Sequence, residues 1–496
     1  MKTINIDNWI KQRIKQNQID KYLNNGKDFI DDDKLNSLLA KNNRPDNKLI
    51  EDIIAKSLEI NTLSLEEVAC LLNVEDDNLL EKMKQACKRI KKNVYDNRIV
   101  TFAPLYLGNF CVNDCLYCGF KRSNLQAKRR VLSVEEIKRE VKVLAGKIGH
   151  KRLIVVYGED PRQGIDYMMQ SIKAIYSVQE KTKHGVGSIR RVNVNASPLS
   201  VEELQKLKEV GIGTYQVFQE TYHHDTYKKV HPINTIKGNY AWRLYCMHRA
   251  FEAGVDDVGL GVLFGLYDWR FEVLGLCAHN IELEKRFNIG AHTISFPRLE
   301  PAHNAPLTLK SQFKVNDRDF KKLIMVIRLA VPYTGMIITA RENALIREEA
   351  VELGITQTDA STKIGIGAYS ENKDIQEDDR QQFILGDTRS LDELIRSFAK
   401  KGHITSFCTA GYRCGRTGKC IMELLKSGAE GKFCKLNAIL TFREWLDDFA
   451  SEETKKVAEP VIEKEINEVK KSMPKVFTQF MDYYGRIKQG ERDLYF

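Results

Sequence analysis

Three cysteines in the first quarter of the chain have the spacing of a metal-binding loop. They are Cys111, Cys115 and Cys118, in the run NFCVNDCLYC. Three thiolates at this spacing can hold one iron–sulfur cube and leave one of its irons without a protein ligand. A zinc site would normally have a fourth cysteine or histidine nearby and paired Cys-x2-Cys spacing. A purely structural trio would be unusual in this loop, so the spacing predicts a 4Fe–4S cluster with one open iron.

The remaining cysteines fall into two kinds. The chain has 11 cysteines, an odd number, which favours metal ligation over disulfides in a chain without a secretory signal. One group near the C-terminus is a candidate for a second metal site: Cys408, Cys414, Cys420 and Cys434. The others lie on apolar helical patterns and are expected to be packed thiols: Cys70, Cys87, Cys246 and Cys277.

Charged residues follow several of the predicted strands. Gly158-Glu159 comes directly after the apolar run RLIVVY, and Glu220 ends the run TYQVFQE. In α/β barrels the active site lies at the C-terminal ends of the strands, so we expect these residues to line one cavity. Arg243 lies in a later helix, where a cavity position and a surface position are both open.

The elements that must position these residues alternate regularly. From about residue 96, short β-rich runs alternate with amphipathic helical runs, giving about eight strand–helix units. This indicates an α/β fold of the (β/α)8 barrel type. A doubly wound open sheet is the alternative, but no glycine-rich dinucleotide fingerprint follows the first strand. The predicted organisation is a helical extension at 1–95, a barrel at 96–370, a C-terminal auxiliary domain at 371–455 and a charged helical tail at 456–496.

Composition excludes two classes of partner. The net charge is +10, but the 77 basic residues are interleaved with 67 acidic ones, which indicates a solvated surface rather than a nucleic-acid interface. No apolar run reaches membrane-spanning length, and the N-terminal residues show no signal-peptide pattern. We therefore expect a cytoplasmic protein that acts on a small molecule.

With these residues in place, the sequence resembles a known family from about Leu65 to Phe449. The Cys-x3-Cys-x2-Cys loop, with Tyr117 before its last cysteine, is the radical S-adenosylmethionine (SAM) signature. The longer matching stretches resemble the tyrosine lyases of FeFe-hydrogenase maturation (HydG-like), and more distantly the thiamine-pathway tyrosine lyases (ThiH, 2-iminoacetate synthase). These stretches are TFAPLYLGNFCVNDCLYCGF, RRVNVNASPLS, GTYQVFQETYH, GVLFGLYDWRFEVL, HTISFPRLEPA, VPYTGMI and SFCTAGYRCGRTGK.

The resemblance implies a lyase that uses two cofactors, the 4Fe–4S cluster and SAM. SAM would bind the open iron and be cleaved to a 5′-deoxyadenosyl radical, which abstracts hydrogen from L-tyrosine. Cleavage of the Cα–Cβ bond would release p-cresol and dehydroglycine (2-iminoacetate). Tyr117, Gly158, Glu159, Glu220 and Arg243 would contact the cofactor. Implied partners are an electron donor such as flavodoxin or ferredoxin, and other hydrogenase maturation proteins.

The barrel departs from the family pattern near the expected substrate site. Arg341 is present and suits a carboxylate ligand, because guanidinium binds carboxylates bidentately. The family's Ser-Ala-Gly-Ser run, however, reads Asp359-Ala-Ser-Thr here. An aspartate at this position would repel a carboxylate or bind an ammonium group, which leaves a substrate other than tyrosine open.

The C-terminal group departs as well. The family's auxiliary cluster uses Cys-x2-Cys and a third, distant cysteine, and the middle position here is Gly411. A rewired site could use Cys408, Cys434 and either Cys414 or Cys420. Three readings therefore stay open: a full maturase that makes carbon monoxide and cyanide at a rewired cluster, a lyase that has lost this cluster, and a non-catalytic scaffold.

Overall fold

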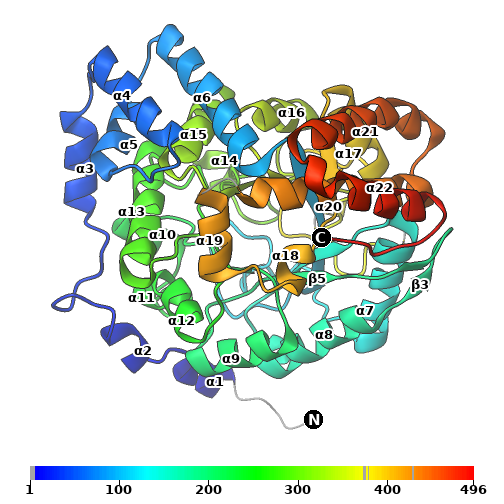
Figure 1. Cartoon of the computed structure of the whole chain (residues 1–496). Coiled ribbons are helices and arrows are strands. Elements are labelled where there is room, and N and C mark those ends of the chain that lie inside the picture. Colours follow the sequence, from blue (N-terminus) through cyan, green and yellow to red (C-terminus); the bar gives the residue numbers. More distant parts are fainter. Residues whose placement is uncertain (1–5, 372–375, 378, 427–428) are drawn as a thin grey trace.

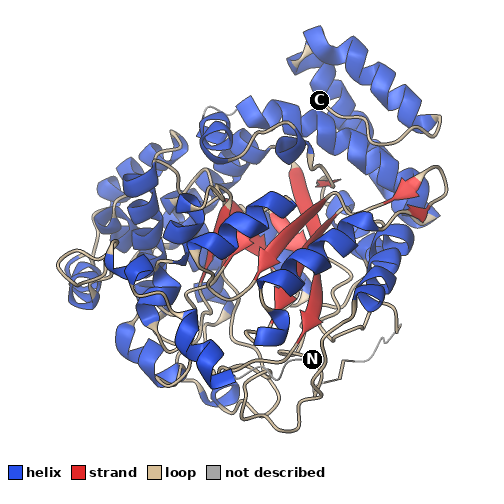
Figure 2. Cartoon of the chain, turned by 90° about the horizontal axis from the view of Figure 1, so that it is seen from below, coloured by secondary structure: helices blue, strands red, loops and turns tan. Residues whose placement is uncertain are grey.

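The computed structural model describes residues 6–371, 376–377, 379–426 and 429–496, and its centre is a closed sheet of eight parallel strands ringed by helices (Figures 1 and 2). Each strand pairs with the next along the sheet, and β10 pairs with β1 to close the barrel. The predicted (β/α)8 barrel is therefore confirmed, and the open sheet is excluded. In sheet order, the strands are β1 (Arg98–Gly108), β2 (Arg152–Tyr157), β5 (Arg191–Asn195), β6 (Tyr215–Gln216), β7 (Val258–Gly261), β8 (Thr293–Ser295), β9 (Gly335–Ile338) and β10 (Gln357–Asp359).

One further strand joins the barrel from outside. In β11 (Ile404–Ser406), the residues pair in parallel with Arg98–Val100, the first residues of β1. Val100 therefore pairs with Gln357 of β10 and also with Ser406 of β11. A small hairpin, β3 (Glu180–Lys181) and β4 (Val186–Gly187), lies apart from this sheet.

The barrel helices begin where the sequence supplies capping residues. Ser133 and Ser200 each accept a hydrogen bond from the backbone N–H three residues on, in capping boxes completed by Glu136 and Glu203. The same box occurs at Ser64, where Glu67 completes it. The main barrel helices are α7 (Val134–Val141), which continues as η1 (Lys142–Ile148), α8 (Ile165–Ser177), α9 (Val201–Val210), α12 (Cys246–Glu252), α13 (Trp269–Phe287), α15 (Asp317–Ala330) and α16 (Ala344–Glu352). Short elements lie between them: η2 (Pro161–Gln163), α10 (His224–Val230), α11 (Tyr240–Leu244) and α14 (Leu307–Lys310). Among the described helices, none combines the length and apolar character needed to cross a bilayer.

The N-terminal helices pack along one flank of the barrel, from α1 at the bottom of Figure 1 to α4–α6 at the top. Their apolar side chains belong to the same hydrophobic core as the barrel, with Ile50, Leu71 and Ile90 fully buried against it. The extension is therefore part of the barrel's fold. It comprises α1 (Ile6–Arg13), α2 (Asn17–Asp20), α3 (Asp32–Lys41), α4 (Asn47–Leu58), α5 (Leu65–Leu72) and α6 (Asp77–Tyr95).

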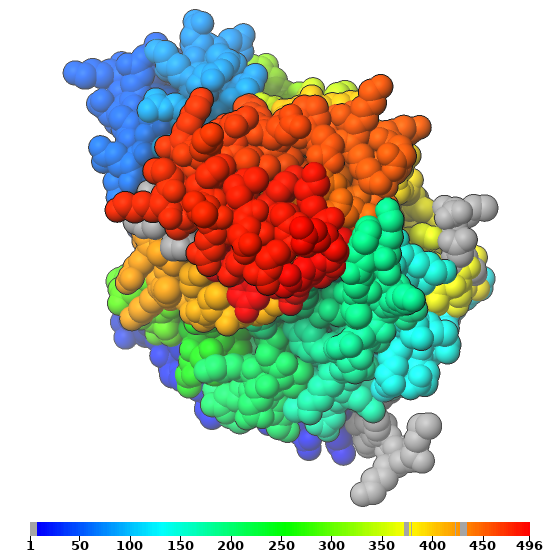
Figure 3. Space-filling view, turned by 45° about the vertical axis from the view of Figure 1, so that its right-hand side comes forward, coloured from blue at the N-terminus to red at the C-terminus, as the bar shows by residue number. Residues whose placement is uncertain are grey.

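Four C-terminal helices build a second hydrophobic core, and their surface is the orange-to-red region of Figure 3. They are α17 (Leu391–Lys400), α20 (Ala429–Phe449), α21 (Glu452–Ser472) and α22 (Pro474–Lys488). Two shorter helices precede α20, α18 (Ala410–Arg413) and α19 (Gly418–Lys426), and the buried Ile421 and Leu425 of α19 belong to the barrel core instead. Ile462 of α21 and Phe480 of α22 are fully buried in this core. The boundary predicted at residue 456 falls inside α21, because the charged sequence there carries an apolar stripe that packs against α17 and α20. Residues 456–488 therefore belong to the C-terminal unit rather than to a separate tail.

Candidate functional site

A cavity lies at the C-terminal ends of the barrel strands and extends inward to Phe102, Ile154 and Ile337. Residues that end or follow β2, β5, β8, β9 and β10 contribute to its wall. The cavity brings together every barrel residue selected from the sequence: Cys111, Cys115, Tyr117, Cys118, Gly158, Glu159, Glu220, Arg243, Arg341 and Asp359.

The three cysteines lie in the loop that follows β1, and hydrogen-bond donors point at two of their sulfur atoms. The backbone N–H of Phe120 donates to Cys118 Sγ at 3.4 Å, and Gln382 Nε2 donates to the same sulfur at 3.6 Å. Asn113 Nδ2 donates to Cys111 Sγ at 3.8 Å. N–H groups aimed at sulfur suit thiolates, which only accept hydrogen bonds, so this donor set fits an iron–sulfur cluster.

Burial also affects the acidity of these thiols. It raises the pKa of Cys111 to about 11 and that of Cys115 to about 12. Without a metal both groups would hold their protons at neutral pH, so ligation must release protons.

The cysteine loop packs closely against the residues that follow β2. The backbone N–H of Val112 donates to Glu159 O at 2.8 Å. A Cβ at Gly158 would overlap the carbonyl oxygen of Phe110, so only glycine fits there.

Glu159 has one engaged and one unsatisfied carboxylate oxygen. Asn113 Nδ2 donates to its Oε2 at 2.6 Å, whereas Oε1 is buried without a hydrogen-bond partner in the described part of the chain. Arg13 Nε of helix α1 lies 4.0 Å from this oxygen. A buried carboxylate oxygen without a donor is costly unless a ligand satisfies it, and the amino group of SAM is such a donor. The residues therefore fit the cofactor that the cysteine loop implies.

Glu220 forms a largely enclosed charge cluster with Lys237 and Arg243 beside the cysteine loop. Lys237 Nζ donates to its Oε1 at 2.7 Å and Arg243 Nη2 at 3.3 Å. Burial raises the pKa of Glu220, but the two cations outweigh this effect and hold it below its usual value. Arg243 Nε also donates to Phe218 O at 2.6 Å, and the side chain is buried. The sequence left open whether Arg243 lies in the cavity or on the surface, and the structure places it in the cavity wall.

Tyr117 lies beside the charged groups of Glu220, Lys237 and Arg243. Its hydroxyl is hydrogen-bonded to His231 Nε2 at 2.7 Å, and Lys237 Nζ lies 5.4 Å from the centre of its ring. Lys237 is a cavity residue to which no sequence motif points. It stands in the loop after α10, away from any strand end, so only the folded chain brings it to the site.

Arg341 and Asp359 lie on the opposite wall. The Arg341 guanidinium lies in the cavity wall, half-buried, with its Cζ 3.3 Å from the centre of the Phe383 ring. Among the described residues, no carboxylate lies within ion-pair distance of it. The two carboxylate oxygens of Asp359 accept hydrogen bonds from Ala340 N and Thr362 Oγ1, each at 2.8 Å. Arg347 Nη2 lies 3.4 Å from Asp359 Oδ1 and offsets its charge.

This arrangement bears on the aspartate that departs from the family. The backbone and Thr362 already occupy both carboxylate oxygens of Asp359, so the group serves mainly as an internal acceptor. Its charge is balanced by Arg347, which weakens the repulsion of a substrate carboxylate.

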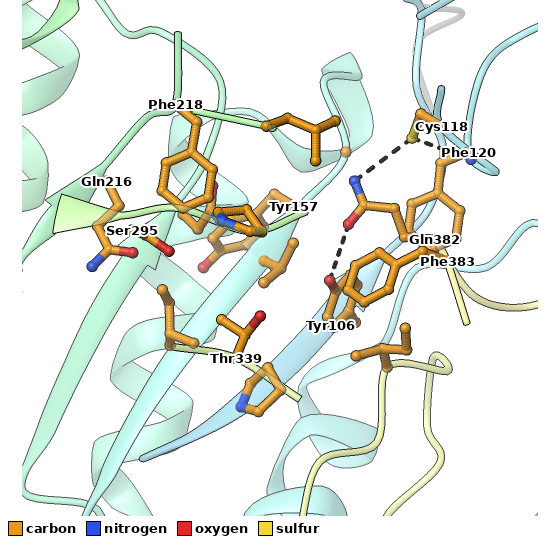
Figure 4. Close-up of a pocket in the computed structure, with 18 of the residues that line it drawn as sticks. Tyr106, Cys118, Phe120, Tyr157, Gln216, Phe218, Ser295, Thr339, Gln382 and Phe383 are labelled. Carbon is orange, nitrogen blue, oxygen red and sulfur yellow. Dashed lines mark hydrogen bonds between the residues drawn. The ribbon is translucent and has the colours of Figure 1, made fainter. Parts of the chain in front are cut away.

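Three further cavity residues were missed from the sequence: Tyr106, Gln382 and Phe383 (Figure 4). Tyr106 lies on β1, and its hydroxyl donates to Gln382 Oε1 at 3.0 Å. Gln382 ends a strongly polar sequence, and Phe383 follows it. Polar composition indicates exposure, yet Asp379 and Gln382 contact the cysteine loop.

The C-terminal cysteines lie outside this cavity. Cys408 and Cys434 are half-buried, whereas Cys414 and Cys420 are exposed. Beside Gly411, Tyr412 reaches the N-terminal mouth of the barrel, where its hydroxyl donates to Asp257 Oδ2 at 2.8 Å and its ring contacts Arg152 and Arg191. The two cysteine groups therefore face opposite ends of the barrel.

The family's three-cysteine set is incomplete at this second position. Glycine supplies no ligand at 411, and the nearest candidate replacements are exposed. Space is not the obstacle, since a Cβ at Gly411 would meet only Arg416 O at 3.6 Å.

Comparisons with known proteins agree with this geometry. Profiles match the radical SAM superfamily at residues 105–274 and the biotin and thiamin synthesis associated domain at 295–404. A crystal structure of HydG, a maturase of the [FeFe]-hydrogenase, is 47% identical with a TM-score of 0.89, covering 94% of this chain and 100% of that one. The maturase HydG from Carboxydothermus hydrogenoformans is 37% identical with a TM-score of 0.75, covering 92% and 97%. The 2-iminoacetate synthase of Escherichia coli (strain K12) is 29% identical over 321 residues, which is 64% of this chain and 81% of that protein. The chain therefore belongs to the HydG family of radical SAM enzymes, related to 2-iminoacetate synthase.

Proposed function

We propose that this enzyme is a carbon–carbon lyase that cleaves the Cα–Cβ bond of L-tyrosine to p-cresol and dehydroglycine, as a step in FeFe-hydrogenase maturation. The observation that carries the proposal is one cavity that unites the three-cysteine loop, the unsatisfied oxygen of Glu159 and the guanidinium of Arg341. Its electron donor would be a flavodoxin or ferredoxin, and its neighbours in the process other maturation proteins.

Two groups of residues would hold the cofactors. Cys111, Cys115 and Cys118 would bind the cluster, while Glu159 Oε1 would accept a hydrogen bond from the SAM amino group. Arg243 is held by Phe218 O and Glu220, which fixes its guanidinium in the cavity wall. When bound, the cluster and SAM supply a 5′-deoxyadenosyl radical.

Arg341 would hold the substrate carboxylate. Its guanidinium has donors in a fixed fork, and the face of Phe383 limits its movement. A substrate fixed at its carboxylate has its side chain directed toward the rest of the cavity, where Phe102, Ile154 and Ile337 offer apolar contact.

Anaerobic reconstitution with SAM, dithionite and tyrosine tests the proposal. We expect 5′-deoxyadenosine and p-cresol to form together, with the Cys111→Ala protein as the inactive control. Strong formation of 5′-deoxyadenosine without p-cresol would overturn tyrosine as the substrate and leave radical chemistry standing.

A second candidate function is the complete maturase reaction, in which dehydroglycine yields carbon monoxide and cyanide at the C-terminal unit. The observation that favours it is the match to HydG over 100% of that chain. The incomplete ligand set at Gly411 opposes it. A haemoglobin trap for carbon monoxide decides between the two, together with iron analysis of a Cys408→Ala, Cys434→Ala double variant. Iron content equal to that of the unaltered protein would show that no second cluster is bound.

A further inference from the structure

Residues 379–387, here termed the strap, are fixed to the cysteine loop at several points. The backbone N–H of Gly119 donates to Gln382 O at 3.1 Å, and that of Lys128 donates to Asp379 O at 2.9 Å. Lys128 Nζ also pairs with Asp379 Oδ2 at 2.7 Å. A Cβ at Gly119 would lie 2.9 Å from Gln381 O, so the glycine is required by this close approach. The strap and the loop therefore hold each other in one arrangement.

The side chain of Gln382 bridges the strap, the barrel and a cluster cysteine (Figure 4). Tyr106 Oη donates to Gln382 Oε1 at 3.0 Å, and Gln382 Nε2 donates to Cys118 Sγ at 3.6 Å. A ligating thiolate can only accept, so the amide nitrogen must face the sulfur. The hydroxyl of Tyr106 then satisfies the amide oxygen, and a single amide orientation meets both partners.

The three cysteines differ in the donors that they receive. Cys118 Sγ accepts from Phe120 N and from Gln382, whereas Cys111 Sγ accepts a longer bond from Asn113. The Phe120 donor belongs to the loop itself. The Gln382 donor comes from a segment 264 residues further along the chain, so it can be removed without changing the sequence of the cysteine loop.

We infer that Gln382 is a positioning residue that raises the reduction potential of the cluster through its hydrogen bond to Cys118, with Tyr106 fixing the amide. Reduction adds one electron to the cluster and increases the negative charge on its sulfur ligands. An N–H donor stabilises the reduced state more than the oxidised state, since hydrogen bonds to the sulfurs set such potentials. The inference rests on the proposed assignment of the cluster to the three cysteines.

The test is an EPR-monitored redox titration of the reconstituted full-length protein. Gln382→Leu removes the donor, and Gln382→Glu keeps the shape but places a carboxylate at the sulfur. We expect both variants to have a lower midpoint potential, with the larger shift in Gln382→Glu. At a fixed potential the ratio of reduced to oxidised cluster should fall by about tenfold in Gln382→Leu, equivalent to about 59 mV for one electron. Tyr106→Phe should shift the potential in the same direction by less.

Gln381→Leu is the matched control, because Gln381 lies on the strap but its amide donates to Gln376 instead. Its potential should equal that of the unaltered protein. Potentials of Gln382→Glu and Tyr106→Phe that match this control would overturn the inference, whether or not Gln382→Leu retains iron. Failure of the unaltered protein to bind a SAM-reactive cluster would instead overturn the proposed function, so the two failures are distinguishable.

Discussion

Replacing Arg341 with glutamine should weaken the binding of tyrosine while leaving the cleavage of SAM possible. The guanidinium lies against Phe383 in the cavity wall, and no described carboxylate is within ion-pair distance, so a substrate carboxylate would be its main ionic contact. A hydrogen bond to a charged group contributes about 1.5–3 kcal/mol. Loss of a bidentate pair therefore costs about 3 kcal/mol at the low end, or a roughly 100-fold increase in KM for tyrosine at about 1.4 kcal/mol per factor of ten.

The assay measures p-cresol formation against tyrosine concentration, with 5′-deoxyadenosine measured in the same samples. Arg341→Lys keeps the charge but loses the fork, so its KM should rise by less than that of Arg341→Gln. Arg318→Gln alters a side chain that is 68% exposed and serves as the control. A KM for Arg341→Gln within threefold of the unaltered enzyme would refute the assignment of Arg341 to the substrate carboxylate.

Three further changes test other parts of the structure. Glu159→Gln should weaken SAM binding about tenfold, as measured by equilibrium dialysis, because the amide is a poorer acceptor for a charged amine; unchanged affinity at full iron content would contradict this. Gly411→Cys restores the missing thiol where a Cβ has space, so iron analysis should show a higher content than in Gly411→Ser, and equal contents would show that no cluster forms there. Burial lowers the pKa of His224, but hydrogen bonds to Asp28 and Asp32 outweigh it and raise the pKa to about 9. This ion pair therefore stabilises the N-terminal segment fully below about pH 6.5 and loses its effect as the pH rises through about 9. Hydrogen-exchange protection near Asp32, corrected for the base-catalysed intrinsic rate, should fall over that range and not in His224→Gln; protection that stays constant with pH would argue against the contact.

The part of the site that the sequence revealed is the part encoded locally. The cysteine spacing lies within one loop, and Glu159 directly follows a strand whose C-terminal end must face the active site of a barrel. Lys237 and Gln382 were missed because nothing in their neighbouring residues points to the site. Their positions depend on how long loops fold back over the barrel, which local patterns do not encode.

Two residues show how the fold changes the interpretation of an amino-acid type. Asp359 reads from the sequence as a charge free to meet the substrate, but its two oxygens accept hydrogen bonds from the backbone of Ala340 and the hydroxyl of Thr362. Ile462 lies in a strongly charged stretch that reads as a solvated tail, but the apolar stripe to which it belongs is buried against α17 and α20. In both cases at least one of the partners lies on another element of the fold, Ala340 after β9 for Asp359 and α17 for α21.

The pairing of β1 with two later strands has a consequence for biosynthesis. β1 is made early, yet Val100 completes its backbone pairing only with Gln357 and Ser406. During translation the first residues of this strand remain an open edge until nearly the whole barrel and the start of the C-terminal unit have left the ribosome. The nascent chain therefore has to be kept from aggregating over most of its synthesis, and a chain ending before β11 would retain part of that exposed edge after release.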